Sequence, residues 1–539
     1  MSEYDPVRLE IFKHLFAAIA EEMGVVLCRS SYSPNIKERR DYSCALFDRY
    51  TNMVAQAAHI PVHLGSMPLS VQAAVQECSD LSPGDVIILN DPFRGGTHLP
   101  DITLVSPVFS QKVGEKDANS KNRHKLIGFV ASRAHHSDVG GMSPGSMPVS
   151  REIFQEGIII PPTKLIQNGV LNQALMDTIL ANVRTPIERS GDLLAQIAAN
   201  KRGVERFLKM HDRYGEQDIS FYMAELLDYT ERLTRNLMNK LGKGEYSFVD
   251  YLDDDGIGNE PVPIRVSVRI DSGSAAIDFT GTAPQQKGSL NAVYAITFSA
   301  VYYVFRSLLG LDIPNNSGCL RPIEIIAPAG SLVNAKPPAA VAGGNVETSQ
   351  RIVDVLLGAL AKIRGLEDMN VRIPAASQGT MNNITIGGFD PFRAKNFAYY
   401  ETIGGGIGAG FESPGLSGLH SHMTNTLNTP VEAIEFDYPF QVLRYELRRG
   451  SGGFGRFSGG DGIRRDIKML TDAHVTLLTE RRRLAPYGLA GGEPGQLGEN
   501  MLLSKGQEHH LPGKASIELQ AGDVLSIRTP GGGGYGKGE

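Results

Sequence analysis

Two short stretches of the sequence combine histidine with aspartate beside turn-forming residues. THLPD places His98 three residues before Asp101, and ASRAHHSDVGG contains His135, His136 and Asp138. Neutral imidazole nitrogens and carboxylate oxygens are ligands that suit zinc, manganese or iron. Two histidines and one or two aspartates would leave a coordination position open, as catalytic metal sites do. The two stretches together therefore predict a catalytic metal site.

The segments around these residues indicate how they could meet. Proline disfavours a helix at THLPD, which predicts a turn that leads into the strand DITLV. The pair His135–His136 follows the apolar run LIGFVAS and precedes a Gly-Gly turn. Since adjacent residues of a strand face opposite ways, only one of the two histidines is expected to reach a shared site. The alternative is that these histidines are turn residues hydrogen-bonded to backbone carbonyls.

Two further stretches contain candidate ligands. Asp41 follows the basic residues Lys37, Arg39 and Arg40, so it is either a third ligand or an ion-paired surface carboxylate. The stretch HSH carries His420 and His422, and it could hold a second metal. No acidic residue accompanies HSH in the sequence, and a hydrogen-bonded loop is the alternative.

The pattern of apolar residues predicts a mixed α/β and α+β chain with several domains. An amphipathic helix is expected over residues 5–27, because Val7, Ile11, Leu15, Ile19 and Met23 recur every four residues. The other expected elements are strands within 42–110, a surface hairpin loop over 111–125, a returning strand, and helices over 172–242, 289–310 and 346–365.

Composition suggests how the chain divides. Glycine contributes 60 of 539 residues, about 11% against a usual ~7%, which predicts tight connections between short strands. Glycine is concentrated near the C-terminus, where the pattern is β-like. The expected domains are a metal-site domain with long helices (1–245), a central α+β domain (246–440) and a Gly-rich, β-dominated C-terminal region (441–539).

Charge and cysteine content exclude several classes of protein. The net charge is −6 without a basic cluster, so nucleic acid is not an expected partner. The four cysteines form no CxxC pair, which favours a reduced, cytoplasmic location. Acidic residues at the N-terminus argue against an export signal. The apolar stretch 289–310 contains Asn291, Ser299 and Arg306, so it is expected to be a buried helix rather than a membrane span.

Six longer motifs occur in order along the chain, and no Walker or GxSxG motif accompanies them. They are GDVIILNDPFRGGTHLPDITLVSPVF, FVASRAHHSDVGG, EIFQEGIIIPP, GTAPQQKGSLNAV, NVETSQRIVDVLLGAL and HMTNTLNTPVEAIEFDYPFQVLRYELRRGSGGFGRFSGGDG. With these motifs the chain resembles the hydantoinase B/oxoprolinase family, whose motifs also recur in acetone and acetophenone carboxylases.

The resemblance implies the metal-bearing subunit of an ATP-dependent hydrolase that opens hydantoin, 5-oxoproline or another lactam. A hydantoinase A-type partner would bind ATP and activate the carbonyl by phosphorylation, in a hetero-oligomer such as a heterotetramer. The implied ligands of a divalent metal, zinc or manganese, are Asp41, His98, Asp101 and either His135 or His136. The alternatives are a subunit of a ketone carboxylase and a non-catalytic assembly subunit.

A role for Asp138 depends on where its side chain points. If Asp138 faces the site, it could act as general base or orient the ligating histidine. If it faces away, it caps the turn before Gly140.

Overall fold

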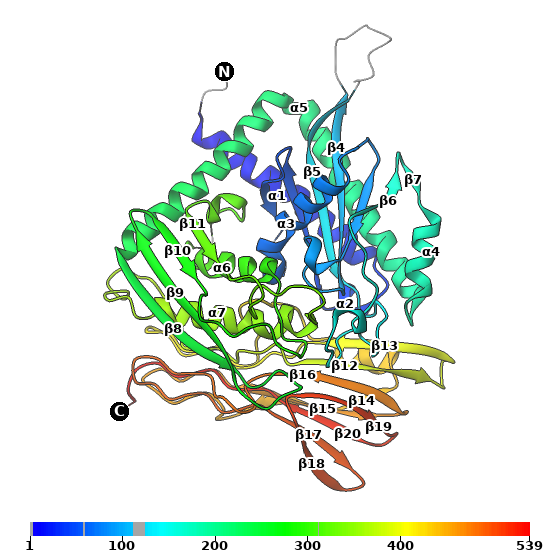
Figure 1. Cartoon of the computed structure of the whole chain (residues 1–539), viewed down its shortest axis with the longest axis vertical. Coiled ribbons are helices and arrows are strands. Elements are labelled where there is room, and N and C mark those ends of the chain that lie inside the picture. The colour runs from blue at the N-terminus through cyan, green and yellow to red at the C-terminus, as the bar shows by residue number, and fades with distance from the viewer. Residues whose placement is uncertain (1–3, 58–59, 112–123, 311, 539) are drawn as a thin grey trace.

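Four β-sheets and the helices packed against them form a mixed α/β structure, which confirms the expected fold class (Figure 1). The computed structural model describes residues 4–57, 60–111, 124–310 and 312–538. The expected loop at 111–125 lies almost entirely outside these residues.

The N-terminal sheet has seven strands in the order β2-β1-β5-β4-β3-β6-β7. All neighbouring strands are antiparallel, and the two longest, β4 and β5, pair along their whole length. The strands are β1 (Tyr42–Asp48), β2 (Met53–Gln56), β3 (Val86–Leu89), β4 (Asp101–Gln111), β5 (His124–His135), β6 (Thr163–Gln167) and β7 (Val170–Leu171).

Helices cover both faces of this sheet. Helices α1 (Pro6–Ser30) and α5 (Pro186–Leu241) pack side by side on one face, and α3 (Pro61–Glu77) packs on the other (Figure 1). Alternate residues of a strand therefore enter different cores: Cys44 packs with the α1/α5 side, whereas Ala45 packs with the α3 side. This alternation decides which strand residues can share a site.

Helix α1 begins where the sequence predicts, because Asp5 accepts a hydrogen bond from the amide of Val7 and Pro6 occupies the first turn. The expected buried face was partly wrong. Val7 and Ile11 are exposed, since a strict four-residue spacing drifts around a helix of 3.6 residues per turn. The buried face follows a mixture of steps of three and four residues, with Leu9, Phe12, Phe16, Ile19, Met23 and Leu27.

The other helices of the N-terminal half are α2 (Pro34–Lys37) and α4 (Gln173–Ala181). Helix α5 is kinked at Gly215, whose φ of 80° is not helical. The polar side chains of Gln196 and Asn200 on α5 reach the sheet, where each donates a hydrogen bond to a carbonyl oxygen of β4.

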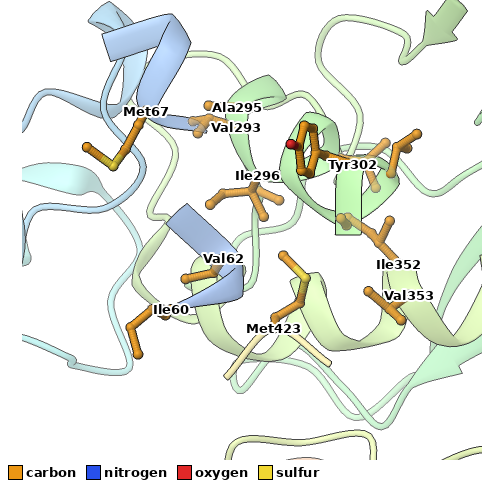
Figure 2. Close-up of a cluster of buried hydrophobic side chains, with 14 of the residues drawn as sticks. Ile60, Val62, Met67, Val293, Ala295, Ile296, Tyr302, Ile352, Val353 and Met423 are labelled. Atoms are coloured by element: carbon orange, nitrogen blue, oxygen red, sulfur yellow. The ribbon is translucent and has the colours of Figure 1, made fainter. Parts of the chain in front are cut away.

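The central part of the chain forms a smaller sheet against two helices. Its strands are β8 (Gly244–Leu252), β9 (Val262–Asp271), β10 (Ser274–Asp278) and β11 (Ile323–Ile326), and its helices are α6 (Tyr294–Leu308) and α7 (Ser349–Leu360). As expected, the apolar stretch from 289 contains a buried helix. No described helix is long and apolar enough to cross a membrane. The start of α3 meets α6 and α7 in one hydrophobic cluster (Figure 2).

Two further sheets lie below these layers (Figure 1). Their orders are β13-β12-β16-β19 and β14-β15-β20-β17-β18, and the short helix α8 (Val431–Asp437) precedes β14. The strands are β12 (Asn383–Asp390), β13 (Lys395–Glu401), β14 (Phe440–Arg448), β15 (Gly462–Met469), β16 (Ala473–Leu478), β17 (Glu499–Ser504), β18 (Gln507–Leu511), β19 (Lys514–Leu519) and β20 (Val524–Arg528). Pairing between β12 and β16 crosses position 440, and the expected domain boundaries stay predictions.

Glycine-rich segments outside these strands form a compact bundle of extended chains. Residues 531–536 hydrogen-bond through the backbone to four other segments, around residues 376, 407, 453–460 and 489–496. The chains approach so closely that a Cβ atom on Gly533 would lie 2.1 Å from the carbonyl oxygen of Tyr487. This close approach, rather than turn formation, explains much of the glycine near the C-terminus.

Candidate metal centre

Three neighbouring strands of the N-terminal sheet, β1, β5 and β4, have ends that lie side by side. Asp101 is the first residue of β4 and lies directly opposite His135, the last residue of β5. Asp41 precedes β1, and its carbonyl oxygen accepts a 3.0 Å hydrogen bond from the amide of His135. The sheet therefore gathers residues that are up to 94 positions apart in the sequence.

The turn before β4 holds His98 beside Asp101. The amide of Asp101 donates to the carbonyl oxygen of His98 at 3.1 Å. Asn90 stabilises the turn, because its side-chain amide donates to the carbonyl oxygen of Leu99 at 2.8 Å. The Thr97 hydroxyl donates to Asp101 Oδ2 at 2.7 Å, which orients the carboxylate. The HxxD spacing thus acts as the sequence predicts, through a tight turn at the start of a strand.

His98, Asp101 and His135 form a compact buried cluster. One potential ligand atom from each lies within 4.8 Å of the others. Asp101 Oδ1 is 3.2 Å from His98 Nε2 and 3.5 Å from His135 Nδ1. The three residues are at most 3% exposed. Such an arrangement of one carboxylate and two imidazoles matches the donor set of zinc and manganese sites.

The charge state of the cluster also suits a cation. Burial alone would raise the pKa of Asp101, but the neighbouring imidazoles of His98 and His63 hold that pKa well below its ordinary value. Burial lowers the pKa of His135, so its imidazole is neutral and keeps a free lone pair. Asp101 Oδ1 is buried without a hydrogen bond from another described residue. A buried anionic oxygen without a donor is costly, and a bound cation would remove that cost.

Asp41 lies at the edge of the cluster rather than within it. Its side chain lines the same small cavity as Asp101 and His135. It is not part of the group whose ligand atoms approach within 4.8 Å. The guanidinium of Arg39 lies 4.0 Å from Asp41 Oδ2. The structure therefore brings Asp41 to the cavity wall, and its role as a ligand stays a prediction.

The geometry separates the paired histidines. His135 faces the α3 side of the sheet, as Asp101 does, whereas His136 faces helix α5. There its Nε2 lies 2.9 Å from Gln196 Oε1. Burial lowers the pKa of His136 to about 4, which keeps it neutral in this polar contact. The structure thus brings His135 and not His136 to the cluster.

Asp138 is directed away from the cavity. Arg184 engages both of its oxygens, since the Arg184 amide donates to Oδ2 at 2.6 Å and Nη1 donates to Oδ1 at 2.9 Å. Asp138 is fully buried and does not line the cavity. This geometry argues against Asp138 as general base, and it indicates a structural role in fixing the connection between α4 and α5.

His63 is a cavity residue that the sequence reasoning missed. It lies near the start of α3, and its Nε2 is 3.4 Å from Asp101 Oδ2. Its Nδ1 lies 2.9 Å from the hydroxyl of Ser43 on β1. His63 therefore contacts the carboxylate oxygen opposite to the one that faces His98 and His135. The only signal in the sequence was a histidine inside an apolar run, which usually indicates a core residue.

Asn345 and Tyr400 also line the cavity, and neither was singled out from the sequence. Asn345 belongs to the π-helical turn Gly344–Thr348 before α7, and its Nδ2 lies 3.0 Å from His98 Nε2. The ring of Tyr400 stacks on His135 with centroids 4.3 Å apart, and its hydroxyl donates to Asn383 at 2.9 Å. The polar run NVETSQ, placed before an apolar helix, could have indicated Asn345.

The HSH stretch does not form a second cluster of this kind among the described residues. It lies in a loop, and His422 Nε2 is 3.7 Å from Asp354 Oδ1. Within the described part of the chain, His98, Asp101 and His135 are the only group of three or more His, Cys, Asp or Glu side chains clustered closely enough to hold one ion.

The fold and the cluster together define a mixed α/β protein with a buried two-histidine, one-carboxylate centre at the ends of central strands of an antiparallel sheet. The sequence matches the Hydantoinase B/oxoprolinase family over residues 5–538. The chain therefore belongs to the hydantoinase B/oxoprolinase family.

Two relatives illustrate the range of the family. The chain is 41% identical to 5-oxoprolinase 1 of Arabidopsis thaliana, across 99% of this chain but only 42% of that protein. It is 30% identical to a protein of Pseudomonas sp. that is named as one subunit of a D-/L-hydantoinase, across 99% of this chain and 90% of that protein. The chain thus spans less than half of the 5-oxoprolinase and nearly all of the hydantoinase subunit.

Two solved structures share the fold. The crystal structure of an ATP-dependent caprolactamase from Pseudomonas jessenii superposes with a TM-score of 0.90 at 27% identity, covering 99% of this chain and 92% of that chain. A nucleotide-free acetone carboxylase superposes with a TM-score of 0.87 at 18% identity, covering 99% and 76% respectively. At 18% identity, the second likeness establishes the fold alone.

Proposed function

We propose that this chain is the metal-bearing component of an ATP-dependent hydrolase of cyclic amides, with hydantoin, 5-oxoproline or another lactam as substrate. The observation that carries the proposal is the buried cluster of His98, Asp101 and His135 in a chain of this family. The names of the relatives, 5-oxoprolinase, hydantoinase and caprolactamase, all denote enzymes that act on cyclic amides.

In this proposal ATP is used by a hydantoinase A-type partner, which phosphorylates the carbonyl before the ring opens. An amide resists hydrolysis because its carbonyl is stabilised by resonance, and phosphorylation would give a better electrophile. Two facts support the division of labour: one relative is named as a single subunit of a hydantoinase, and 5-oxoprolinase 1 is more than twice as long as its matching part. A hetero-oligomer, such as a heterotetramer, and a cytoplasmic location with four free cysteines belong to the same proposal.

The side chains of the site have distinct tasks in this scheme. A divalent cation, zinc or manganese, would polarise a carbonyl oxygen or lower the pKa of a water molecule. His98, Asp101 and His135 would hold the cation. Thr97 and His63 orient Asp101, and Tyr400 fixes the ring plane of His135 by stacking. The cavity has a volume of only about 20 Å³, and the three residues of the cluster are buried, which limits their contact with bulk water.

The proposal is tested with the purified chain and its ATP-binding partner. We expect stoichiometric zinc or manganese by elemental analysis, and ATP-dependent ring opening of at least one lactam or hydantoin. His98→Ala and Asp101→Ala should lose both the metal and the activity. The isolated chain should not bind ATP in calorimetry. Unchanged metal content and activity in both variants would refute the proposal.

The same experiment separates the two alternatives. The first alternative, a ketone carboxylase subunit, is considered because the chain shares its fold with acetone carboxylase. Such a subunit would require bicarbonate and a ketone instead of a lactam. A non-catalytic assembly subunit would contain no metal. Parallel assays with and without bicarbonate therefore identify the reaction, and the elemental analysis identifies a chain without catalytic metal.

A further inference from the structure

A surface pocket adjoins the small cavity of the metal centre. It has a volume of about 430 Å³, and Ile60 lines both the pocket and the cavity. Two further stretches of chain pass from one to the other: Asp41 lines the cavity while its neighbours Arg40 and Tyr42 line the pocket, and Thr424 lines the cavity while Asn425 lines the pocket. The pocket and the cavity are therefore neighbours that share Ile60 as a lining residue.

The apolar part of the lining of the cavity, here called the wall, comes from separate elements. Ile60 and Val62 lie at the start of α3, and Met423 lies on the loop that follows HSH (Figure 2). The amide of Val62 donates to the carbonyl oxygen of Met423 at 3.0 Å, which joins the two parts of the wall. Since a space of about 20 Å³ is smaller than any lactam, a substrate must displace part of this wall.

Two arginines give the pocket an excess of positive charge. Arg29, at the end of α1, and Arg40 line it together with the carboxylate of Glu21. Both arginines are exposed, and neither guanidinium forms a hydrogen bond or ion pair with another described residue. Arg40 has a φ of 57°, a left-handed conformation that is unusual for a side chain of this size. This bend directs Arg40 outward between the buried residues Arg39 and Asp41.

We infer that this pocket is the entrance to the metal centre and that Arg29 and Arg40 bind an anionic oxygen group of the incoming substrate. The inference rests on the proposed function and adds the substrate's chemistry to it. The anionic group is either a carboxylate that the cyclic amide carries or the phosphoryl group of its activated form. A guanidinium binds both through paired N–H donors.

The kinetic test uses Arg29→Gln and Arg40→Gln in the assembled enzyme with its partner. Arg269→Gln is the matched control, because Arg269 is also exposed and lines a different surface pocket, of about 630 Å³, which shares no lining residue with the metal cavity. We expect Arg40→Gln to lower kcat/KM about tenfold, as expected for one lost charge-assisted contact of ~1.4 kcal/mol. The control should stay within twofold of the wild type.

Two substrates distinguish the sources of the anion. 5-Oxoproline carries a carboxylate, whereas hydantoin does not. A rise in KM for 5-oxoproline alone assigns the pocket to the substrate carboxylate. An equal loss of kcat/KM for both substrates, with inorganic phosphate as a competitive inhibitor, assigns it to the phosphoryl group. Either result supports the inference, and values equal to those of Arg269→Gln with both substrates would overturn it.

Cys28 provides a readout that does not depend on turnover. It lines the same pocket and is partly exposed, whereas the other three cysteines are buried. Inorganic phosphate or 5-oxoproline should slow alkylation of Cys28 in the wild type, and this protection should disappear in Arg40→Gln but not in Arg269→Gln. Cys28→Ser verifies that the label is on this residue. If the enzyme is inactive but the anions still protect Cys28, the proposed function is refuted and the binding of anions in the pocket is not. If neither inorganic phosphate nor 5-oxoproline protects Cys28, the inference that the pocket is the entrance is refuted.

Discussion

Asp101 and His135 are directly opposite each other on the antiparallel strands β4 and β5. Their side chains consequently emerge on the same face of the sheet, and Asp101 Oδ1 lies 3.5 Å from His135 Nδ1. A slip of one residue in this pairing would turn His135 to the α5 side and abolish the cluster. The centre therefore depends on strand register as much as on the identity of its residues.

The first prediction concerns the two adjacent histidines. His135→Ala should release the metal and reduce activity by at least about a hundredfold, because it removes one of three clustered donors. His136→Ala is the matched control, and it should retain the metal because His136 contacts Gln196 instead. Elemental analysis of both variants tests this. Loss of metal in His136→Ala with retention in His135→Ala would reverse the assignment.

The second prediction concerns Asp138, which the structure pairs with Arg184. Asp138→Asn should keep the metal and the pH dependence of activity, because the side chain does not reach the cavity. The variant should unfold at lower urea concentration, with a cost of about 1–3 kcal/mol for a weakened buried charge–amide contact. An altered pH profile with unchanged stability would restore the catalytic role.

The third prediction concerns Glu347, next to the site on the π-helical turn. Burial, followed by the nearby carboxylate of Glu480, raises the pKa of Glu347 to about 8. An unfolded glutamate has a pKa of about 4.3, so the folded chain holds an extra proton between these values. Folding stability contributed by neutral Glu347 is therefore present below pH ~4.3 and is lost as pH rises towards 8.

Glu347→Gln should remove this pH dependence, because glutamine stays neutral and keeps an oxygen that can accept from Met381 and Asn383. Urea unfolding at pH 5, 7 and 9 measures the free energy of unfolding of both proteins. The free energy of unfolding of the variant should rise by a few kcal/mol relative to that of the wild type as pH increases, since each pKa unit is worth about 1.4 kcal/mol. Parallel pH profiles would show that Glu347 is ionised in the folded chain.

The fourth prediction concerns the glycine bundle. Gly533→Ala should lower the free energy of unfolding by about 1–3 kcal/mol, because the added Cβ would lie 2.1 Å from the backbone oxygen of Tyr487. Gly410→Ala is the control, since a Cβ there meets nothing within 4 Å. Thermal unfolding of the two variants provides the measurement. Equal melting temperatures would mean that the chains around Gly533 shift to accept the Cβ without loss of stability.

Much of the local structure could be predicted from the sequence. Proline in THLPD and the apolar run after it define a turn and a strand, and Asp101 is indeed the first residue of β4. Asp5 and Pro6 define the start of α1. The mixed fold class followed from the alternation of strand-like and helical segments. These features depend on neighbouring residues, so local patterns are sufficient.

The missing parts depend on contacts between distant segments. The choice between His135 and His136 requires the register of β5 against β4, which no local pattern contains. His63 and Asn345 reach the cavity from α3 and from the turn before α7. His63 resembles an ordinary core residue in its own segment, and the polar run around Asn345 does not indicate which distant segment it faces. Asp138 looked like a site residue because it is close to His135 in the sequence, although a strand end can direct neighbours to different sides.

The glycine bundle also has a consequence for the order in which the protein folds during synthesis. Residues 531–536 supply backbone partners to four segments that leave the ribosome up to about 155 residues earlier, the first near residue 376. Those segments have few apolar side chains with which to collapse, so they must wait for residues 531–536 before they can close. The strands that carry Asp101 and His135 have no such dependence and can pair much earlier, whereas the cavity beside them is complete only after Tyr400, Met423 and Thr424 have been made.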